Sequence, residues 1–238
     1  MKNWNRLERD LFIAFLAWSG AGLIFTLLHV SPETVLQWPL PRWLVRFIGF
    51  CLATGDPILI ILAFANTHLN AARQWSGPLA RHWGLLLLVA SLAIETLGAC
   101  TGIPFGSYHY TDRFGPLLGV VPMTIPLAWY VVVTNSLFIV RTMMPHGSRL
   151  TEAALTGLLC TAYDFILEPF ATAVKHYWIW AGESIPLQNY ASWFVLGGLL
   201  VWLFAPTVST RFRRDPRPIL ILLVTLLIFV AGRWAYLH

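Results

Sequence analysis

The chain has 238 residues, of which 57% are hydrophobic and only 11% are charged. A soluble domain carries about 25% charged residues, so these values exclude an ordinary soluble fold and also a disordered chain. The net charge of +5 gives no reason to expect nucleic-acid binding, because the arginines lie mostly in short loops between apolar runs.

Seven apolar runs are long enough to span a bilayer as helices, which need about 20 predominantly apolar residues each. They cover approximately residues 11–30, 44–65, 84–103, 119–140, 150–171, 191–208 and 218–236. The sequence therefore predicts an all-α, polytopic helical membrane protein with about seven transmembrane helices, in a range of six to eight. No linker separates these runs, so we expect residues 1–238 to form a single integral membrane domain.

Lysine and arginine residues are unevenly distributed between the two sides of the predicted membrane. Eleven lie in the N-terminal segment and in the loops around 66–83, 141–149 and 209–217, whereas five lie on the other side. Cytoplasmic loops carry an excess of these residues. We therefore expect a multi-pass protein of the cytoplasmic membrane, with its N-terminus in the cytoplasm and its C-terminus outside.

Two loops on the side poor in lysine and arginine are rich in tyrosine and tryptophan. One comprises residues 102–112 and the other residues 176–190. Such rings gather at membrane interfaces, so an aromatic belt would explain the composition alone. Gly102, Pro104 and Gly106 set backbone turns at defined points, which favours a shaped lid over a cavity.

Four carboxyl groups fall inside predicted spans, at Asp56, Glu95, Asp164 and Glu168. An ionised carboxylate at the centre of a membrane helix costs roughly 2.5–3.5 kcal/mol, so such residues normally face the protein interior and have a function. The alternative for each is a protonated acid that only holds two helices together. Asp56 lies in the middle of the second span, at a depth that allows it to join the other three.

The spacing of the other acids favours a shared site. Asp164 and Glu168 are four residues apart and therefore lie on one face of a helix. Glu95 shares a face with Gly98 and Gly102, a spacing that predicts the close approach of another helix. Both helices lead outward into the aromatic loops. We therefore expect these three acids to line one cavity beneath the loops.

The chemistry of such a cavity follows from its low dielectric constant. Two neighbouring carboxyl groups there do not readily ionise together, which leaves a neutral acid beside an ionised base at neutral pH. No His and Cys cluster accompanies the acids and no glycine-rich nucleotide motif occurs, so we expect neither a metal nor another cofactor. The sequence predicts a proton-transfer reaction on a lipophilic substrate.

These acids and loops together resemble the CruF-type carotenoid hydratases, within the wider family of carotenoid biosynthesis membrane proteins. The family often has Asp where this chain has Glu168, which keeps the carboxyl group but changes its reach. The resemblance covers residues 95–193, while the flanking helices match only in hydropathy. The matching residues are Glu95, Gly98, Gly102, Pro104, Phe105, Gly106, Tyr108, Tyr110, Gly115, Pro116, Val121, Pro122, Pro126, Trp129, Asp164, Pro169, Trp178, Pro186, Asn189 and Trp193.

The resemblance implies a hydro-lyase that adds water across the 1,2 double bond of an acyclic (ψ) carotenoid end group without a cofactor. Its partners would be a lipophilic carotenoid and membrane lipid, with no nucleic acid and an oligomeric state that the sequence leaves open. The candidate catalytic residues are Glu95, Asp164 and Glu168. The candidate substrate-binding residues are Phe105, Tyr108, Tyr110, Trp129, Asn189, Trp193 and Asp56.

Three other functions compete with this hypothesis. A carotenoid end-group cyclase or isomerase starts with the same protonation but quenches the cation in a dry pocket, whereas Asp164, Glu168 and Asn189 favour a bound water. A proton-coupled membrane transporter would use the acids as a relay, but the sequence shows no paired broken helices. A purely structural role would use the acids only to hold helices together.

Overall fold

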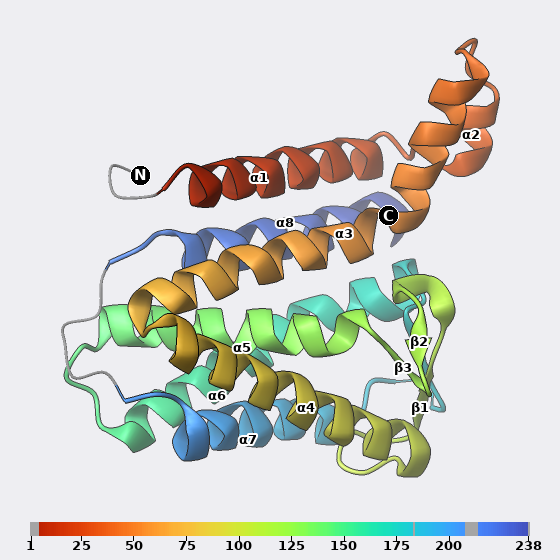
Figure 1. Ribbon diagram of the computed structural model, residues 1–238. Coiled ribbons are helices and arrows are strands. Elements are labelled where there is room, and N and C mark those ends of the chain that lie inside the picture. The colour runs from red at the N-terminus through yellow and green to blue at the C-terminus, as the bar shows by residue number, and fades with distance from the viewer. Residues whose placement is uncertain (1–4, 183, 208–213, 238) are drawn as a thin grey trace.

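The computed structural model describes residues 5–182, 184–207 and 214–237, and these residues are mostly helical (Figure 1). Seven helices are long and apolar enough to cross a membrane, which confirms the predicted all-α class and the predicted number. They are α1 (Arg6–Leu27), α3 (Arg42–Gln74), α4 (Gly77–Thr101), α5 (Thr124–Met143), α6 (Arg149–Pro169), α7 (Leu187–Phe204) and α8 (Arg217–Leu237). Shorter helical segments are α2 (Pro32–Leu36), the 3₁₀ turn Asp112–Phe114 and the π-helical turn Phe170–Val174.

Several helix boundaries differ from the predicted ones. α1 and α4 begin at Arg6 and Gly77, five and seven residues earlier than predicted, because the residues that precede these apolar runs are also helical. α3 continues to Gln74, well beyond the apolar run. Its last turns contain polar residues, which a search for apolar runs leaves out. α5 begins at Thr124, because strand β3 (Val121–Pro122) occupies the residues before it. α7 ends at Phe204 because Pro206 follows, and the residue before a proline disfavours the helical conformation. The predicted end of this span at residue 208 lies outside the described residues.

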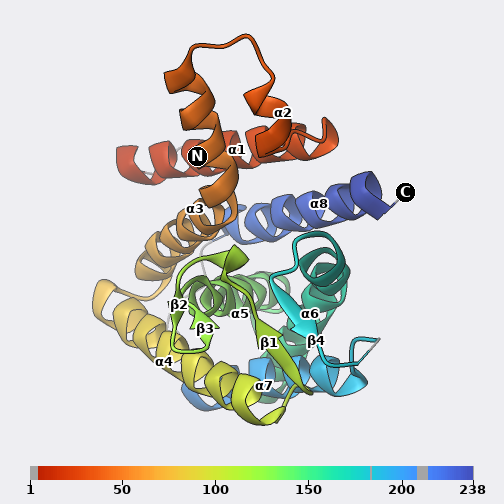
Figure 2. The ribbon, with the colours of Figure 1, turned by 90° about the vertical axis from the view of Figure 1, so that its right-hand side faces the viewer.

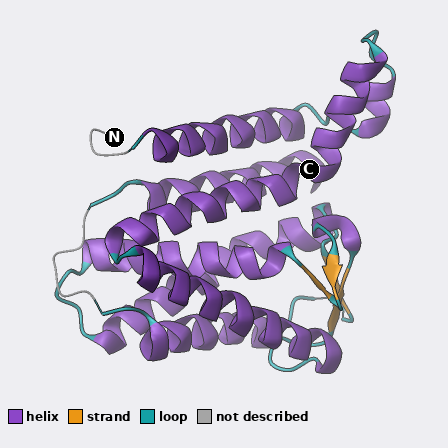
Figure 3. Ribbon diagram, viewed as in Figure 1, coloured by secondary structure: helices purple, strands orange, loops and turns teal. Residues whose placement is uncertain are grey.

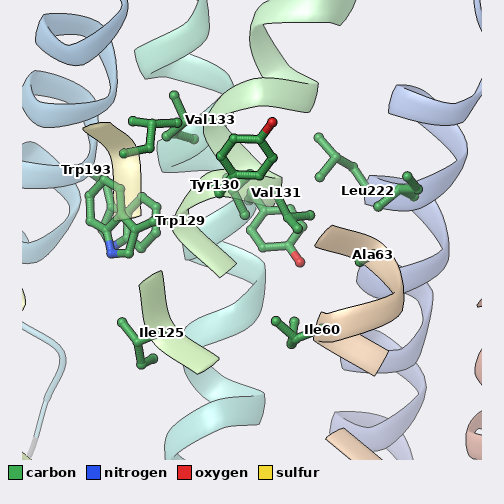
Figure 4. Packing of buried hydrophobic residues seen from close by; sticks show 14 of the residues in the cluster. Ile60, Ala63, Ile125, Trp129, Tyr130, Val131, Val133, Trp193 and Leu222 are labelled. Atoms are coloured by element: carbon green, nitrogen blue, oxygen red, sulfur yellow. The ribbon is translucent and has the colours of Figure 1, made fainter. Parts of the chain in front are cut away.

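Helix α5 forms the centre of the molecule. Fifteen of its twenty residues are buried, and a helix that is buried on all sides must be surrounded by other elements. Viewed along its axis, α5 lies inside a ring formed by α3, α4, α6, α7 and α8 (Figure 2). The close-up in Figure 4 shows its Trp129, Tyr130 and Val131 among residues of these neighbours. The other long helices bury only part of their surface, as expected for helices that face lipid.

Helix α3 bends sharply, so that its first half rises away from the bundle together with α2 (Figure 1). Pro57 lies inside this helix, where it removes one backbone hydrogen bond and crowds the preceding turn. At the bend, Trp18 of α1 donates its Nε1–H to the carbonyl oxygen of Gly55 at 2.9 Å. This bond ties α1 to the bend.

Four short strands lie at one end of the bundle, called the loop end here (Figure 3). Strand β1 (Tyr108–Tyr110) pairs antiparallel with β4 (Trp178–Trp180). Strand β2 (Leu117–Leu118) pairs with β3 in a small hairpin. The two aromatic loops predicted from the sequence therefore join in one two-stranded ribbon across the end of the helices.

Helices α6 and α7 approach each other closely at glycine residues. A Cβ atom on Gly157 of α6 would overlap the carbonyl oxygen of Phe194 on α7, and one on Gly197 would lie 3.2 Å from the Sγ atom of Cys160. Small residues at such contacts allow two membrane helices to pack backbone to backbone. The contact fixes the position of α7 relative to the acids of α6.

We predict that Gly157→Leu separates α6 from α7 and destabilises the protein by about 1–3 kcal/mol or more, the usual cost of overpacking. The matched control is Gly49→Leu, because a Cβ atom on Gly49 meets nothing within 4 Å. Thermal unfolding in detergent, followed by circular dichroism, should show a lower midpoint for the first variant only. Equal midpoints would contradict the close packing.

We predict from the charge distribution that the loop end faces the exterior. A reporter fused after Gly182 should be active outside the cell, and one fused after Gly147 should be active in the cytoplasm. The loop around 209–217, which contributes four of the cationic residues, lies partly outside the described residues. Activity of both reporters on one side, or the reverse pattern, would contradict the predicted orientation.

Candidate functional site

A cavity of about 70 Å³ lies at the loop end, with walls supplied by α3 to α8 and by strands β1 and β4. Its lining combines aromatic and aliphatic side chains with three buried acids, which is the usual make-up of a ligand site. The structure brings together all ten candidate residues in this lining: Asp56, Glu95, Phe105, Tyr108, Tyr110, Trp129, Asp164, Glu168, Asn189 and Trp193.

Glu95 lies near the end of α4, and only 4% of its surface is exposed. The hydroxyl groups of Tyr108 and Tyr110 donate to its Oε2 atom at 2.6 and 2.7 Å. Trp129 of α5 donates its Nε1–H to Oε1 at 2.6 Å. Burial, and then the charge of Glu95, raises the pKa of both tyrosines, so their hydroxyl groups keep their protons. Three donors from two different elements therefore hold this carboxyl group.

The prediction that another helix packs against Gly98 is wrong. The close neighbours of Gly98 are side chains of the loop that follows α4: a Cβ atom there would lie 2.7 Å from Cδ2 of Phe105 and 2.9 Å from the hydroxyl oxygen of Tyr108. Gly102 ends the helix with φ at 77°, a left-handed conformation that favours glycine. The glycines allow the chain to fold back so that the tyrosines reach Glu95.

Asp164 and Glu168 share one donor, the side-chain amide of Asn189 on α7. Its Nδ2 atom lies 2.7 Å from Oδ2 of Asp164 and 3.1 Å from Oε1 of Glu168. Because an amide nitrogen carries two hydrogens, it can serve both acceptors at once. The two acids are one helical turn apart, as predicted, and 1% and 2% exposed. Asn189 therefore links them into one cluster.

Glu168 is held on its other oxygen by two tryptophans of β4. The Nε1–H groups of Trp178 and Trp180 donate to Oε2 at 3.2 and 3.0 Å. The π-helical turn Phe170–Val174 continues α6, and the chain then turns at His176, whose φ is 53°, so that β4 returns over the end of its own helix. Such widened turns occur frequently at functional sites.

The sequence reasoning missed Trp178 and Trp180 as part of the site, although it noted the aromatic loop that contains them. Alternate residues of a strand point to the same side. In the ribbon Tyr108 pairs with Trp180 and Tyr110 with Trp178, so all four point inward, whereas the pair His109 and Ile179 is exposed. The signal was the spacing of two between aromatic residues in both loops.

Asp164 differs from the other two acids in its hydrogen bonds. Its Oδ1 atom is buried and has no hydrogen-bond partner among the described residues, whereas both oxygens of Glu95 and of Glu168 accept hydrogen bonds. A buried polar atom without a partner is costly, and most have one. Asp164 therefore has one oxygen that is free to bind a ligand in the cavity.

An aromatic pair forms the wall between α5 and α7. The rings of Trp129 and Trp193 are stacked with centroids 4.0 Å apart and an interplanar angle of 4° (Figure 4). Phe105 lies against Trp129, with centroids 6.3 Å apart. The faces of such rings attract cations, most strongly in a site without water. The wall therefore suits a substrate that becomes positively charged.

Asp56 lines the cavity but bonds away from the other acids. Lys175 places its Nζ atom 2.9 Å from Oδ2 of Asp56, and the two side chains are 33% and 28% exposed. This ion pair satisfies the charge of Asp56 at the edge of the site.

The sequence matches the family model described as "Carotenoid biosynthesis protein" over residues 55–238. It is 34% identical over 133 residues to a protein of Haloarcula japonica named bisanhydrobacterioruberin hydratase, across 52% of this chain and 45% of that protein. The chain therefore spans less than half the length of this curated relative. No solved structure matches the chain.

The family match covers more than half of the chain and includes every residue of the cavity, from Asp56 onward. It confirms the wider family that the acids and the loop motif resembled. The chain belongs to the carotenoid biosynthesis protein family.

Proposed function

We propose that the protein is a carotenoid hydratase that adds water across the 1,2 double bond of an acyclic (ψ) end group. Family membership and the name of the Haloarcula relative, a hydratase, support this class of reaction. The observation that carries the proposal is the single unpartnered carboxyl oxygen, Oδ1 of Asp164, in an apolar cavity with two fully bonded carboxyl groups.

The hydrogen-bond donors indicate which acid carries the proton. The indole N–H groups of Trp178 and Trp180 and the amide nitrogen of Asn189 can only donate, so both oxygens of Glu168 act as acceptors, as in an ionised carboxylate. Glu95 also faces three donors. Asp164 faces one donor and has a free oxygen that accommodates a hydrogen. Asp164 is therefore the acid that protonates the substrate.

The reaction balances with water alone. Asp164 transfers its proton from Oδ1 to C2 of the alkene, and the positive charge develops at C1, a tertiary centre. Water adds to C1, and the proton that it loses returns to Asp164, so the product is a tertiary alcohol and the acid is regenerated. Glu168, linked to Asp164 through Asn189, is close enough to orient the water.

The surroundings of the alkene lower the energy of the cation. Glu95 and Glu168 bring two negative charges into a site of low dielectric constant, where fixed charges act more strongly than in water. Trp129 and Trp193 cover one face of each other by stacking, so only the outer faces of the two rings can contribute. Because their donors hold the carboxylates in place, these groups do not reorganise during the reaction.

The substrate is a long apolar molecule that reaches the site from the bilayer, so the proposal includes a location in the cytoplasmic membrane. It also treats residues 1–238 as one membrane domain, because six helices from α3 to α8 contribute to the same cavity. A cyclase would begin with the same protonation, and the next experiment separates the two reactions.

We predict that membranes containing the protein convert lycopene into an alcohol without oxygen, nucleotide or added metal. In anaerobic, chelator-treated membranes supplied with ¹⁸O-labelled water, mass spectrometry should find the label in a new hydroxyl group. A ring-containing product of unchanged mass would identify a cyclase. Label that comes from dioxygen would identify a hydroxylase and contradict the proposal.

We predict that Asp164→Asn folds normally but loses activity by about 10²–10⁴-fold, the usual contribution of general acid–base catalysis. The new amide can keep the oxygen that faces Asn189 and place its NH₂ group at the unpartnered position, so no hydrogen bond of the fold is lost. Asp112→Asn is the matched control, because this exposed acid lies in the same loop region. A folded Asp164→Asn protein with near-normal turnover would refute the assignment.

Glu168→Gln and Glu95→Gln should behave differently from Asp164→Asn. Each would place an NH₂ group against donors, which leaves buried groups without partners at a cost of about 1–3 kcal/mol each. Their unfolding midpoints should therefore fall while that of Asp164→Asn stays close to wild type. Equal stability of all three variants would contradict the inferred charges.

A further inference from the structure

A second cavity, of about 320 Å³, lies beside the first one. Its walls come from α1, from the first half of α3, from α8 and from Lys175 after α6. Asp56, Leu59 and Ile228 line both cavities, so the two adjoin along these three residues. We call the first one the inner cavity and the second one the outer cavity.

The sizes of the two cavities set what each can hold. A cavity of about 150 Å³ in another protein is large enough for benzene, so the inner cavity, at about 70 Å³, accepts only the tip of a hydrocarbon chain. Ligand sites usually measure about 300–1,000 Å³, and the outer cavity falls in this range. A substrate whose end reacts in the inner cavity must therefore extend elsewhere.

The outer cavity is suited to a hydrocarbon, because most of its wall is apolar and several of its polar groups are bonded within the protein. Trp18 donates its Nε1–H to Gly55, and the hydroxyl of Ser19 donates to the carbonyl oxygen of Phe15 at 2.7 Å. Asp56 is paired with Lys175. Most of the remaining wall is apolar and is formed by residues such as Phe25, Val30, Phe47, Ile48 and Leu52.

We infer that the outer cavity binds the polyene chain of the same substrate molecule whose end group reacts beside Asp164. This inference rests on the proposed function and identifies the part of the site that selects substrates by their length. The chain would pass between the two cavities at Leu59 and Ile228, beside the Asp56–Lys175 ion pair. A lipid acyl chain has similar chemistry, and the experiment below distinguishes it from the polyene.

The positions of the lining residues in the sequence indicate that the outer cavity determines which substrates are accepted. Every residue of the inner cavity falls within the family match over residues 55–238, whereas eleven of the seventeen residues of the outer cavity precede residue 55. The reacting end group is thus held by the matched part of the chain. The rest of the substrate is held mainly by α1 and the first half of α3.

Gly22 and Gly20 on α1 provide a matched pair for the test. A Cβ atom on either residue meets nothing within 4 Å, so both positions accept a large side chain. Gly22 lines the outer cavity, and Gly20 does not. Gly22→Phe should fill the outer cavity, while Gly20→Phe makes the same chemical change on the same helix outside it.

The substrates are lycopene and 2-methyl-2-butene, a five-carbon hydrocarbon that consists of little more than the same trisubstituted alkene. One methylene group of misfit in an apolar pocket changes kcat/KM by roughly 10–200-fold, so Gly22→Phe should lower kcat/KM for lycopene by at least about tenfold. The short substrate, which needs only the inner cavity, should react within about twofold of wild type in both variants. Gly20→Phe should match wild type with both substrates.

Lycopene binding is measured separately, by quenching of tryptophan fluorescence in lipid nanodiscs, with and without excess phospholipid. The inference is supported if lycopene quenches the fluorescence of the wild type, if excess phospholipid does not reverse this quenching, and if Gly22→Phe abolishes it. If these results are found but no alcohol forms, only the proposed function fails. Wild-type behaviour of Gly22→Phe in both assays would overturn the inference and leave the proposed function intact. Displacement by phospholipid, or equal losses with both substrates, would also overturn it.

Discussion

The need to supply hydrogen-bond donors to buried carboxyl groups shapes the whole loop end of this protein. An ionised acid within a membrane protein is stable only if fixed donors replace the water that it has lost. Here the donors are two tyrosines, three tryptophans and one asparagine, drawn from both strands of the ribbon and from α5 and α7. The ribbon is therefore part of the candidate site, because without it Glu95 and Glu168 would each lose two of their three donors.

This requirement explains why the surrounding helices are packed so tightly. Asn189 reaches both acids of α6 only because α7 lies against α6 at Gly157, and Trp129 reaches Glu95 from the central helix. Trp193 then stacks on Trp129 from the opposite side. A shift of one helix by a fraction of an ångström would lengthen several of these bonds together, so the packing of the bundle and the geometry of the acids depend on each other.

The amino-acid sequence is sufficient to predict the features that depend on local patterns. Runs of apolar residues predict seven spans, and acids within those runs point to Glu95, Asp164 and Glu168 because charge in lipid is costly. The spacing of two in each loop indicates that Trp178 and Trp180 point to one side, but their role depends on the pairing of two loops about 70 residues apart, which that spacing does not reveal. In the same way, the spacing of Gly98 predicts a close neighbour, but only the fold shows that this neighbour is the loop and not a helix. The outer cavity was also hidden, because it arises from the bend at Pro57 and from α1, which is tied to that bend.

The two cavities differ in the hydrogen bonding of the polar groups that line them. In the outer cavity the polar groups Trp18, Ser19 and Asp56 are bonded within the protein, and most of the surface exposed to a ligand is apolar. In the inner cavity both oxygens of Glu95 and of Glu168 are also bonded, whereas Oδ1 of Asp164 has no partner among the described residues. In the proposed complex the hydrocarbon chain gains nothing from polar contacts and is held by shape and apolar surface, whereas its terminal alkene meets the one acid that has an unbonded oxygen. On the proposed function, the selection of the substrate and the reaction of its end group can vary independently, because the first depends on the volume of the outer cavity beside α1 and the second on the proton of Asp164.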